Sequence, residues 1–222
     1  MINMERVFPS LYYTFKYQIT DGTQVDFVYI DTVTLCGNNK AIRFAGPWET
    51  IFSESYEEPK GPEDVAAAEA HWAWIEKELA SSRAAYLFVA GHFPVWSIAE
   101  HGPTHCLVDR LEPLLTKYNV TAYLSGHDHN LQHIKTNQKG WTNNYLVSGC
   151  GAWLDDSEKH KGSIPPESLK FNYPLPSWFG VSVFNKGCFV YSDINSVSAD
   201  FKFYRGNGKQ VYSISIPPRK FV

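Results

Sequence analysis

Residues 86–92 read Tyr-Leu-Phe-Val-Ala-Gly-His, and residues 120–129 read Val-Thr-Ala-Tyr-Leu-Ser-Gly-His-Asp-His. Each stretch is a short apolar run, typical of a buried strand, followed by a loop that begins with glycine and carries histidine. Between them, from about Thr104 to Lys117, leucines recur at helical spacing: Leu107, Leu111, Leu114 and Leu115. An order of strand, helix and strand with nearly continuous apolar strands predicts a sheet covered by helices.

The sequence before residue 86 continues this alternation. Residues 25–30 are β-branched and aromatic and end at Asp31, which predicts a buried strand followed by a turn. Residues 38–61 have no steady period and contain several glycines and prolines, which indicates a long surface loop. Pro62 suits the first turn of a helix. The residues after it predict one apolar helix face: Val65, Ala68, Trp72, Ile75 and Leu79.

The sequence after Leu131 has a different texture. Short apolar runs at residues 145–148, 180–184, 188–191, 201–204 and 211–216 alternate with Gly and Asn turns, which favours antiparallel strands. The fold class is therefore expected to be α/β in the first half of the chain and α+β in the second. Because no linker or internal repeat interrupts the chain, we expect residues 1–222 to form one domain.

Composition excludes several classes of protein. With 222 residues and 44% hydrophobic content, the chain has enough apolar surface to fold around a core. Its net charge of −3 offers no positive field for nucleic acid. No apolar run approaches the ~20 residues of a membrane span, and no signal peptide is expected, since no apolar signal segment follows residues 1–6. The four cysteines fit either disulfides or buried thiols.

The chemistry is concentrated in the loops at residues 91–105 and 126–130. These loops hold five of the eight histidines, His92, His101, His105, His127 and His129. Neutral imidazole binds zinc or iron, and the ends of strands are where open α/β sheets bind ligands, so the clustering favours a metal site. A carboxylate between two ligands, such as Asp128, more often supports the ligands or lies exposed to solvent than binds the metal itself. His105 precedes an apolar helix and is expected at the helix start or on the surface.

The segments at residues 89–106 and 120–131 closely resemble the purple acid phosphatases, and in particular their small animal, tartrate-resistant type. This resemblance implies a metallophosphoesterase fold of two packed sheets flanked by helices, and a site that holds Fe(III) beside Fe(II) or Zn(II). His92 and His127 match ligands of the divalent metal, and His129 matches the ferric ligand. His101, assisted by Glu100, matches the group that stabilises or protonates the leaving alkoxide.

The resemblance also implies properties of the whole protein. It implies hydrolysis of phosphate monoesters, either small molecules or phosphoproteins, by a secreted or lysosomal enzyme that is a monomer as the full-length parent. A disulfide between Cys36 and Cys106 is expected on the same ground. The glycosylation sequon at residues 119–121 fits such a parent.

The chain departs from the family's pattern in its ligand set. The family's remaining ligands lie in Gly-Asp-Trp-Gly and Gly-Asn-His-Asp motifs and in a bridging Asp with a nearby Tyr, and none of these motifs occurs here. We therefore expect an N-terminally truncated calcineurin-like metallophosphoesterase domain with an incomplete ligand set, which suits a hard ferric ion poorly. Two functions follow: an acid phosphatase represented by its C-terminal portion, or a truncated, non-catalytic product with a binding role or none.

Overall fold

The computed structural model describes residues 10–38, 40–43, 54–151, 154–176 and 187–220. Its main element is a seven-stranded sheet in the order β1-β2-β5-β6-β8-β7-β9. Strands β2, β5, β6 and β8 are parallel, and the outer strands pair antiparallel. The bounds are β1 (Tyr13–Gln18), β2 (Gln24–Tyr29), β5 (Tyr86–Ala90), β6 (Ala122–Ser125), β8 (Trp141–Ser148), β7 (Leu131–Gln138) and β9 (Leu169–Tyr173).

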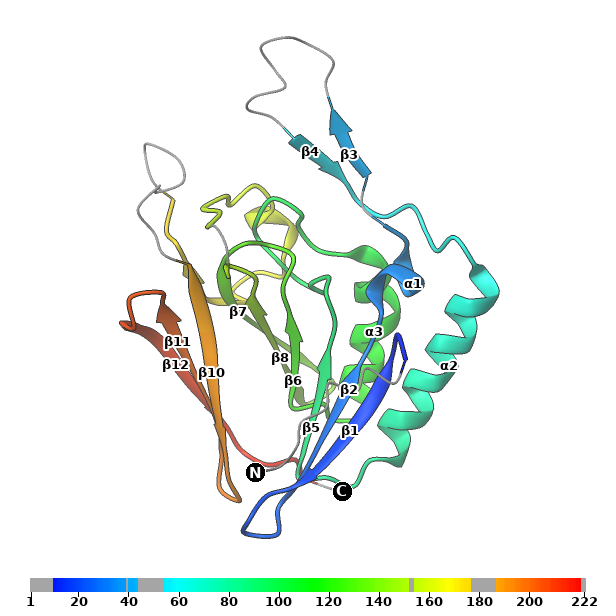
Figure 1. The fold of residues 1–222 in the computed structure, drawn as a ribbon, viewed down its shortest axis with the longest axis vertical. Coiled ribbons are helices and arrows are strands. Elements are labelled where there is room, and N and C mark those ends of the chain that lie inside the picture. The colour runs from blue at the N-terminus through cyan, green and yellow to red at the C-terminus, as the bar shows by residue number, and fades with distance from the viewer. Residues whose placement is uncertain (1–9, 39, 44–53, 152–153, 177–186, 221–222) are drawn as a thin grey trace.

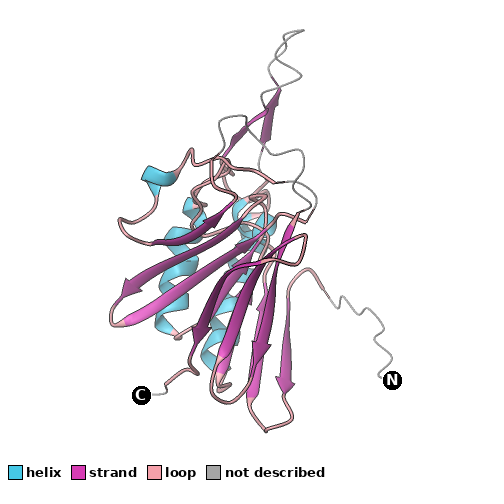
Figure 2. Ribbon diagram, turned by 90° about the vertical axis from the view of Figure 1, so that its left-hand side faces the viewer, coloured by secondary structure: helices cyan, strands magenta, loops and turns pink. Residues whose placement is uncertain are grey.

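Helices cover one face of this sheet and a second sheet covers part of the other (Figure 1). The helices are α2 (Val65–Ser81) and α3 (His105–Lys117), and the second sheet is antiparallel, with β10 (Cys188–Ile194), β11 (Ala199–Arg205) and β12 (Gln210–Ile216). Alternation along β5 explains both contacts: Leu87 packs toward the helices and Phe88 toward Phe201 of the second sheet. The expected fold, two packed sheets with flanking helices, is confirmed; the two long helices lie on one outer face (Figure 2).

Both long helices begin where a side chain or a loop contact can satisfy their first amide groups. Helix α2 starts at Val65, three residues later than the Pro62 start that the sequence suggested, because the carboxylate of Asp64 accepts from Ala67 N at 3.0 Å and caps the helix. In consequence Val65 is 64% exposed, while the other four residues of the predicted apolar face are buried. Helix α3 agrees with prediction within one residue.

Residues 32–61 contain more regular structure than the loop pattern indicated. A short helix α1 (Thr32–Cys36) replaces the predicted turn, because Asp31 accepts from the amides of Val33 and Thr34. Within the predicted loop, β3 (Lys40–Arg43) and β4 (Glu54–Glu57) form a hairpin that projects from the body of the molecule (Figures 1 and 2). The strand expected at residues 180–184 lies outside the described residues.

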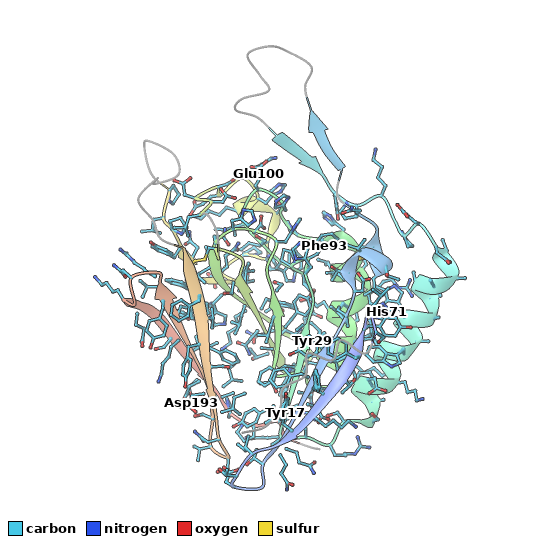
Figure 3. All side chains as sticks on the ribbon, in the orientation of Figure 1. Tyr17, Tyr29, His71, Phe93, Glu100 and Asp193 are labelled. Atoms are coloured by element: carbon cyan, nitrogen blue, oxygen red, sulfur yellow. A yellow bond between two sulfur atoms is a disulfide. The ribbon has the colours of Figure 1, made fainter. Side chains whose placement is uncertain are left out.

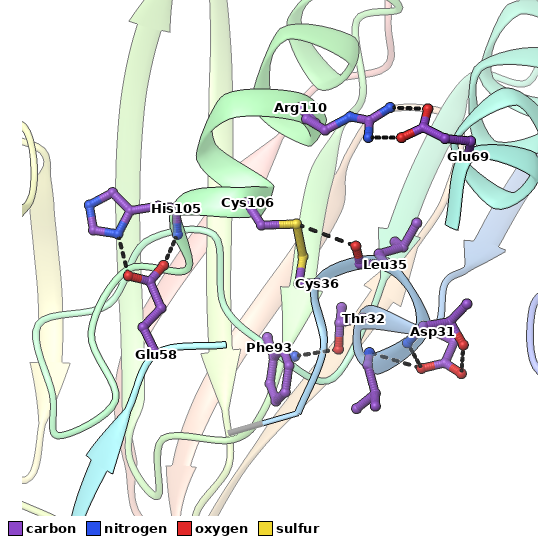
Figure 4. The surroundings of a disulfide bond; sticks show 12 residues. Asp31, Thr32, Leu35, Cys36, Glu58, Glu69, Phe93, His105, Cys106 and Arg110 are labelled. Carbon is purple, nitrogen blue, oxygen red and sulfur yellow. Dashed lines mark hydrogen bonds and ion pairs between the residues drawn. A yellow bond between two sulfur atoms is a disulfide. The ribbon is translucent and has the colours of Figure 1, made fainter. Parts of the chain in front are cut away.

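Two disulfides join distant segments of the described chain. The expected pair Cys36–Cys106 is confirmed, and it joins the end of α1 to the start of α3 (Figure 4). The sequence left Cys150 and Cys188 without partners; the structure pairs them, which links the end of β8 to the start of β10. One disulfide therefore ties together the helical side of the main sheet, and the other ties the main sheet to the second sheet.

An aromatic surface remains on the β1–β2 ribbon, beside the second sheet. Phe15 and Tyr17 are 39% and 54% exposed, and Tyr13, Phe27 and Tyr29 are half-buried neighbours in ring contact with them. Tyr17 and Tyr29 are labelled in Figure 3. The opposite face of β2 is covered, because Val28 packs with α2 in the main core. An exposed apolar patch of this kind is typical of an interaction surface.

We expect His71 to make the fold less stable in acid. It is buried in α2 under the ring of Tyr12, whose centroid lies 3.8 Å away, and burial lowers the pKa of His71 to about 4, although the charge of Asp31 raises it slightly. The imidazole of the unfolded chain binds a proton near pH 6.5. The contribution of His71 to the free energy of unfolding is therefore complete above pH 6.5 and decreases by roughly 3 kcal/mol as the pH falls to about 4. Urea unfolding at pH 7.5 and pH 4 should show that His71→Phe loses less unfolding free energy between the two pH values than the wild type does, by about that amount.

His105→Gln is the control for this experiment, because the side chain of His105 is 67% exposed. The control should keep the wild-type difference in unfolding free energy between the two pH values. An equal pH dependence in wild type and His71→Phe would show that His71 is protonated as readily in the folded chain as in the unfolded one.

Candidate active site

Two loops that carry the predicted histidines emerge side by side at one edge of the main sheet. The parallel strands β5 and β6 pair directly, with Phe88 opposite Ala122, so their carboxyl ends meet at the same edge. Backbone bonds continue the pairing into the loops: Gly91 N donates to Leu124 O at 3.0 Å, and Gly126 N donates to His92 O at 3.2 Å. In Figure 3, Phe93 and Glu100 lie at this end of the sheet.

The structure brings the predicted metal-side histidines and His101 together. The Nε2 atom of His92 and the Nδ1 atom of His127 are 3.1 Å apart. The ring of His101 stacks on the ring of His127 with 3.9 Å between centroids. His129 is close enough for its charge to lower the pKa of each of these three imidazoles. Four of the five loop histidines therefore form one cluster.

Tight backbone packing holds these loops in place. A Cβ atom on Gly91 would come within 2.6 Å of the Tyr123 hydroxyl, and one on Gly149 would come within 2.1 Å of the carbonyl oxygen of Asp128. His127 itself has a φ of +65°, a conformation that a non-glycine residue adopts only when its surroundings fix it. Substituting either glycine should therefore displace the histidine loops. Gly91 directly precedes His92 in the sequence, whereas Gly149 precedes no histidine.

Desolvation and mutual repulsion favour the neutral form of the clustered imidazoles. Desolvation is the main cause of a lowered pKa for His92, for His101, where the pKa is about 4, and for His127, where it is about 3. Repulsion from neighbouring imidazoles adds to the effect at each position, while the charge of Glu100 opposes it at His101. Neutral rings keep a lone pair for binding a cation, which is the state that a metal ligand requires.

Glu100 forms polar contacts with two residues of the segment after residue 154. Its carboxylate accepts from the Lys159 ammonium at 2.7 Å and from the Ser157 hydroxyl at 3.4 Å. The negative charge of Glu100 raises the pKa of His101 and so opposes the larger effect of desolvation. His105 starts α3 on the surface, as the sequence suggested, and binds Glu58 through its backbone amide at 2.6 Å and its ring Nδ1 at 2.8 Å (Figure 4).

Asp128 is fully buried between the two loops. Its carboxylate accepts from the Ser97 hydroxyl and, at 3.0 Å, from the backbone amide of His101. Burial raises the pKa of Asp128 to about 7, against the lowering effect of these two hydrogen bonds. The carboxylate is thus directed into the protein and away from the imidazoles, in agreement with a supporting role.

The described residues do not fit a dinuclear iron or iron–zinc centre. Among them, no group of three or more His, Cys, Asp or Glu side chains is arranged to hold a metal ion. The site offers imidazole nitrogens, and Asp128, the carboxylate nearest in sequence, is already bound to Ser97 and His101. A pair of cations that includes Fe(III) needs oxygen donors that bridge or flank it, so the roles of His92, His127 and His129 as ligands stay a prediction.

Sequence reasoning missed the side chains that support the site. Ser97 and Gln132 are fully buried and contact both loops, yet single serine and glutamine residues carry no signal for metal chemistry. Gly149 was missed because it lies after β8, 22 residues beyond His127 in the sequence. Ser97 and Gln132 are recognised by their burial and hydrogen bonds, and Gly149 by the close approach of the Asp128 carbonyl.

None of the helices in the described part of the chain is long and apolar enough to cross a membrane.

Comparison with known proteins identifies the family. The calcineurin-like phosphoesterase family matches residues 3–131. Tartrate-resistant acid phosphatase type 5 of Homo sapiens is 39% identical over 214 residues, which are 96% of this chain and 59% of that protein. The solved structure of GAP50, the anchor in the inner membrane complex of Plasmodium, has a TM-score of 0.65 at 17% identity and covers 96% of this chain and 56% of that one. Purple acid phosphatase PPD1 from yellow lupin (Lupinus luteus) has a TM-score of 0.52 at 18% identity, covering 93% and 32%.

These similarities differ in what they establish. At 17% and 18% identity the two solved structures show a shared fold alone. The chain spans less than two thirds of the length of the human relative. The family match is the broader finding, because it covers more than half of the chain and includes both histidine loops. Fold, histidine cluster and family match together place this chain in the calcineurin-like phosphoesterase family.

Proposed function

We propose that this chain contributes the histidine side of an acid phosphatase active site, which hydrolyses phosphate monoesters such as small phosphate esters or phosphoproteins. The observation that carries the proposal is the cluster of His92, His101, His127 and His129 at the carboxyl ends of β5 and β6. The similarity to tartrate-resistant acid phosphatase type 5 supports the choice of reaction. The proposal takes residues 1–222 as one calcineurin-like domain.

Within this proposal, His92, His127 and His129 are the metal-side imidazoles, with Fe(III) and Fe(II) or Zn(II) as the metals by resemblance. Because the described residues do not complete such a centre, no step is assigned to a metal here. His101 is the proton donor to the leaving oxygen, since its ring lies against His127 at the edge of the cluster. Glu100 favours the protonated form of His101 through its charge, and Lys159 holds that carboxylate. A secreted or lysosomal location belongs to the same proposal.

The experiment places before residue 1 a segment of a family relative that carries the Gly-Asp-Trp-Gly and Gly-Asn-His-Asp motifs, and measures p-nitrophenyl phosphate hydrolysis at acid pH. The joined polypeptide should be active, and His127→Ala should abolish the activity. His105→Gln is the control, because the side chain of His105 lies on the surface against Glu58, outside the cluster, and its replacement should leave turnover unchanged. Inactivity of a correctly folded joined polypeptide would favour the alternative of a non-catalytic product with a binding role or none.

A further inference from the structure

A buried polar network lies directly behind the histidine cluster. Ser97, Asp128 and Gln132 are all fully buried, and they come from the loop after β5, the loop after β6 and the start of β7 (Leu131–Gln138). Buried polar groups cost free energy unless they are hydrogen-bonded, so a network of three at one place requires an explanation. The site chemistry described above does not use any of their side chains directly.

Most bonds of the network end on the segment that leads to His101, while the bond from the Gln132 amide nitrogen to Asn130 Oδ1 at 2.9 Å ends on the loop after β6. The Gln132 side-chain oxygen accepts from Ile98 N at 3.0 Å, and its amide nitrogen donates to the Ser97 hydroxyl at 2.7 Å. The Ser97 oxygen also accepts from Ala99 N at 3.1 Å. Asp128 accepts from the Ser97 hydroxyl and, at 3.0 Å, from His101 N. Three backbone amides, those of residues 98, 99 and 101, are thereby fixed within four residues.

We propose that Asp128, Ser97 and Gln132 are positioning residues for His101, which they hold with its ring against His127 where a leaving oxygen would need a proton. The inference rests on the proposed function for its catalytic meaning, and on the hydrogen bonds alone for its structural part. Asp128 is central because it joins the two histidine loops: it lies between His127 and His129 in the sequence and binds the amide of His101 across the site.

Counting donors and acceptors shows why ionised Asp128 fits this network and an asparagine does not. The Ser97 hydroxyl gives its single hydrogen to Asp128, and its oxygen already accepts from Gln132 and Ala99. In Asp128→Asn, an amide oxygen can still accept from His101 N, but the amide nitrogen would then face a serine oxygen with no free lone pair. The asparagine therefore has to give up one of the two bonds, and the segment that carries His101 should shift.

A second buried aspartate provides a matched control. Asp26 in β2 is also buried and also accepts from a serine, with the Ser82 hydroxyl 2.7 Å away, but it lies in a different part of the main sheet, near Arg219. Asp128→Asn and Asp26→Asn thus make the same chemical change in similar surroundings. Both variants should be less stable than the wild type, and only the first should alter His101.

The test is NMR on the 222-residue chain. In the wild type, the ring protons of His101 should show the ring-current shift and the cross-peaks expected from stacking on His127. In Asp128→Asn and in Ser97→Ala these signals should be lost, and the amide of His101 should exchange at least tenfold faster relative to Leu87 in the core. The double variant should resemble the stronger single variant, since both break one network. Ser97→Ala decides the question if Asp128→Asn does not fold.

The proposal is overturned if both variants keep the stacking signals and the relative exchange within twofold of wild type, or if Asp26→Asn changes His101 as much. In the joined polypeptide, Asp128→Asn should lower kcat at least tenfold with KM within threefold, because the proposal assigns Asp128 to the position of the proton donor and to no substrate contact. An unchanged kcat there would overturn the positioning role while the proposed function stands. An inactive joined polypeptide would remove the proposed function, and the NMR result would still decide whether the network holds His101.

Discussion

The 222-residue chain by itself is expected to hydrolyse p-nitrophenyl phosphate at least ~1,000-fold more slowly than the joined polypeptide. The described residues supply neutral imidazoles, but they contain no group of three or more side chains arranged to hold a metal ion. Stabilising the charge that develops on a phosphoryl group is usually the largest part of catalysis, and losing even one preorganised donor costs about 100- to 1,000-fold. Loss of the donors for two cations should therefore cost at least as much.

The measurement is the initial rate at acid pH for samples treated with chelator and then supplied with Zn²⁺ or Fe²⁺. Gel filtration should confirm that the sample is folded and not aggregated, since the aromatic surface of β1 and β2 favours association. His127→Ala of the short chain is the control for contaminating phosphatase. The prediction fails if added metal restores turnover by the 222-residue chain and His127→Ala abolishes that turnover. The residues of this chain would then complete a working site by themselves.

Removing the disulfide between Cys36 and Cys106 is expected to destabilise the fold by about 4 kcal/mol. The bond closes a segment with a sequence separation of 70 residues, and the chain-entropy argument gives about this value for a loop of that length. For a domain of this size, 4 kcal/mol corresponds to a melting temperature lower by roughly 8–16 °C. The prediction concerns Cys36→Ala together with Cys106→Ala, so that no unpaired thiol remains.

The control is the corresponding double variant of Cys150 and Cys188, whose sequence separation is 38. Chain entropy predicts a similar loss for it, also about 4 kcal/mol, so the two variants should differ in where they loosen the chain. Loss of Cys36–Cys106 should raise hydrogen exchange at the start of α3, beside the contact of His105 with Glu58. If calorimetry finds the first variant within about 1 kcal/mol of wild type, the chain-entropy argument does not hold here. Residual structure would then already restrict this loop in the unfolded chain.

The sequence predicts those parts of the site whose interacting residues are close together along the chain or are related by a simple rule of topology. The apolar runs before Gly91 and Gly126 identified two buried strands, and parallel strands of one sheet end at the same edge. The proximity of His92 and His127, 35 residues apart, could therefore be expected from local patterns together with one rule of topology. The leucines of α3 gave its position to within one residue, because periodic burial of one helix face is a local property.

Strand β7 shows where a local pattern fails. Its buried residues include Gln132, His133 and Thr136, so it lacks the apolar alternation that marks a strand. These side chains are satisfied by partners far away in the sequence: His133 binds Tyr212 at 2.9 Å and Asn144 at 3.2 Å. The strand exists because β8 and β9 pair with its backbone on both sides, and that pairing is decided by the assembled sheet.

The sequence by itself determined the two histidine loops, the strands and helix that present them, and, through resemblance, the pairing of Cys36 with Cys106. Only the tertiary structure decided the partner of Cys150, the direction of the Asp128 carboxylate and the contact of Glu100 with Lys159. The physical reason is that periodicity and turn chemistry act over a few neighbouring residues. A hydrogen bond such as that from Ser97 to Asp128 joins groups 31 residues apart, and it forms only after the sheet has brought both loops to one edge.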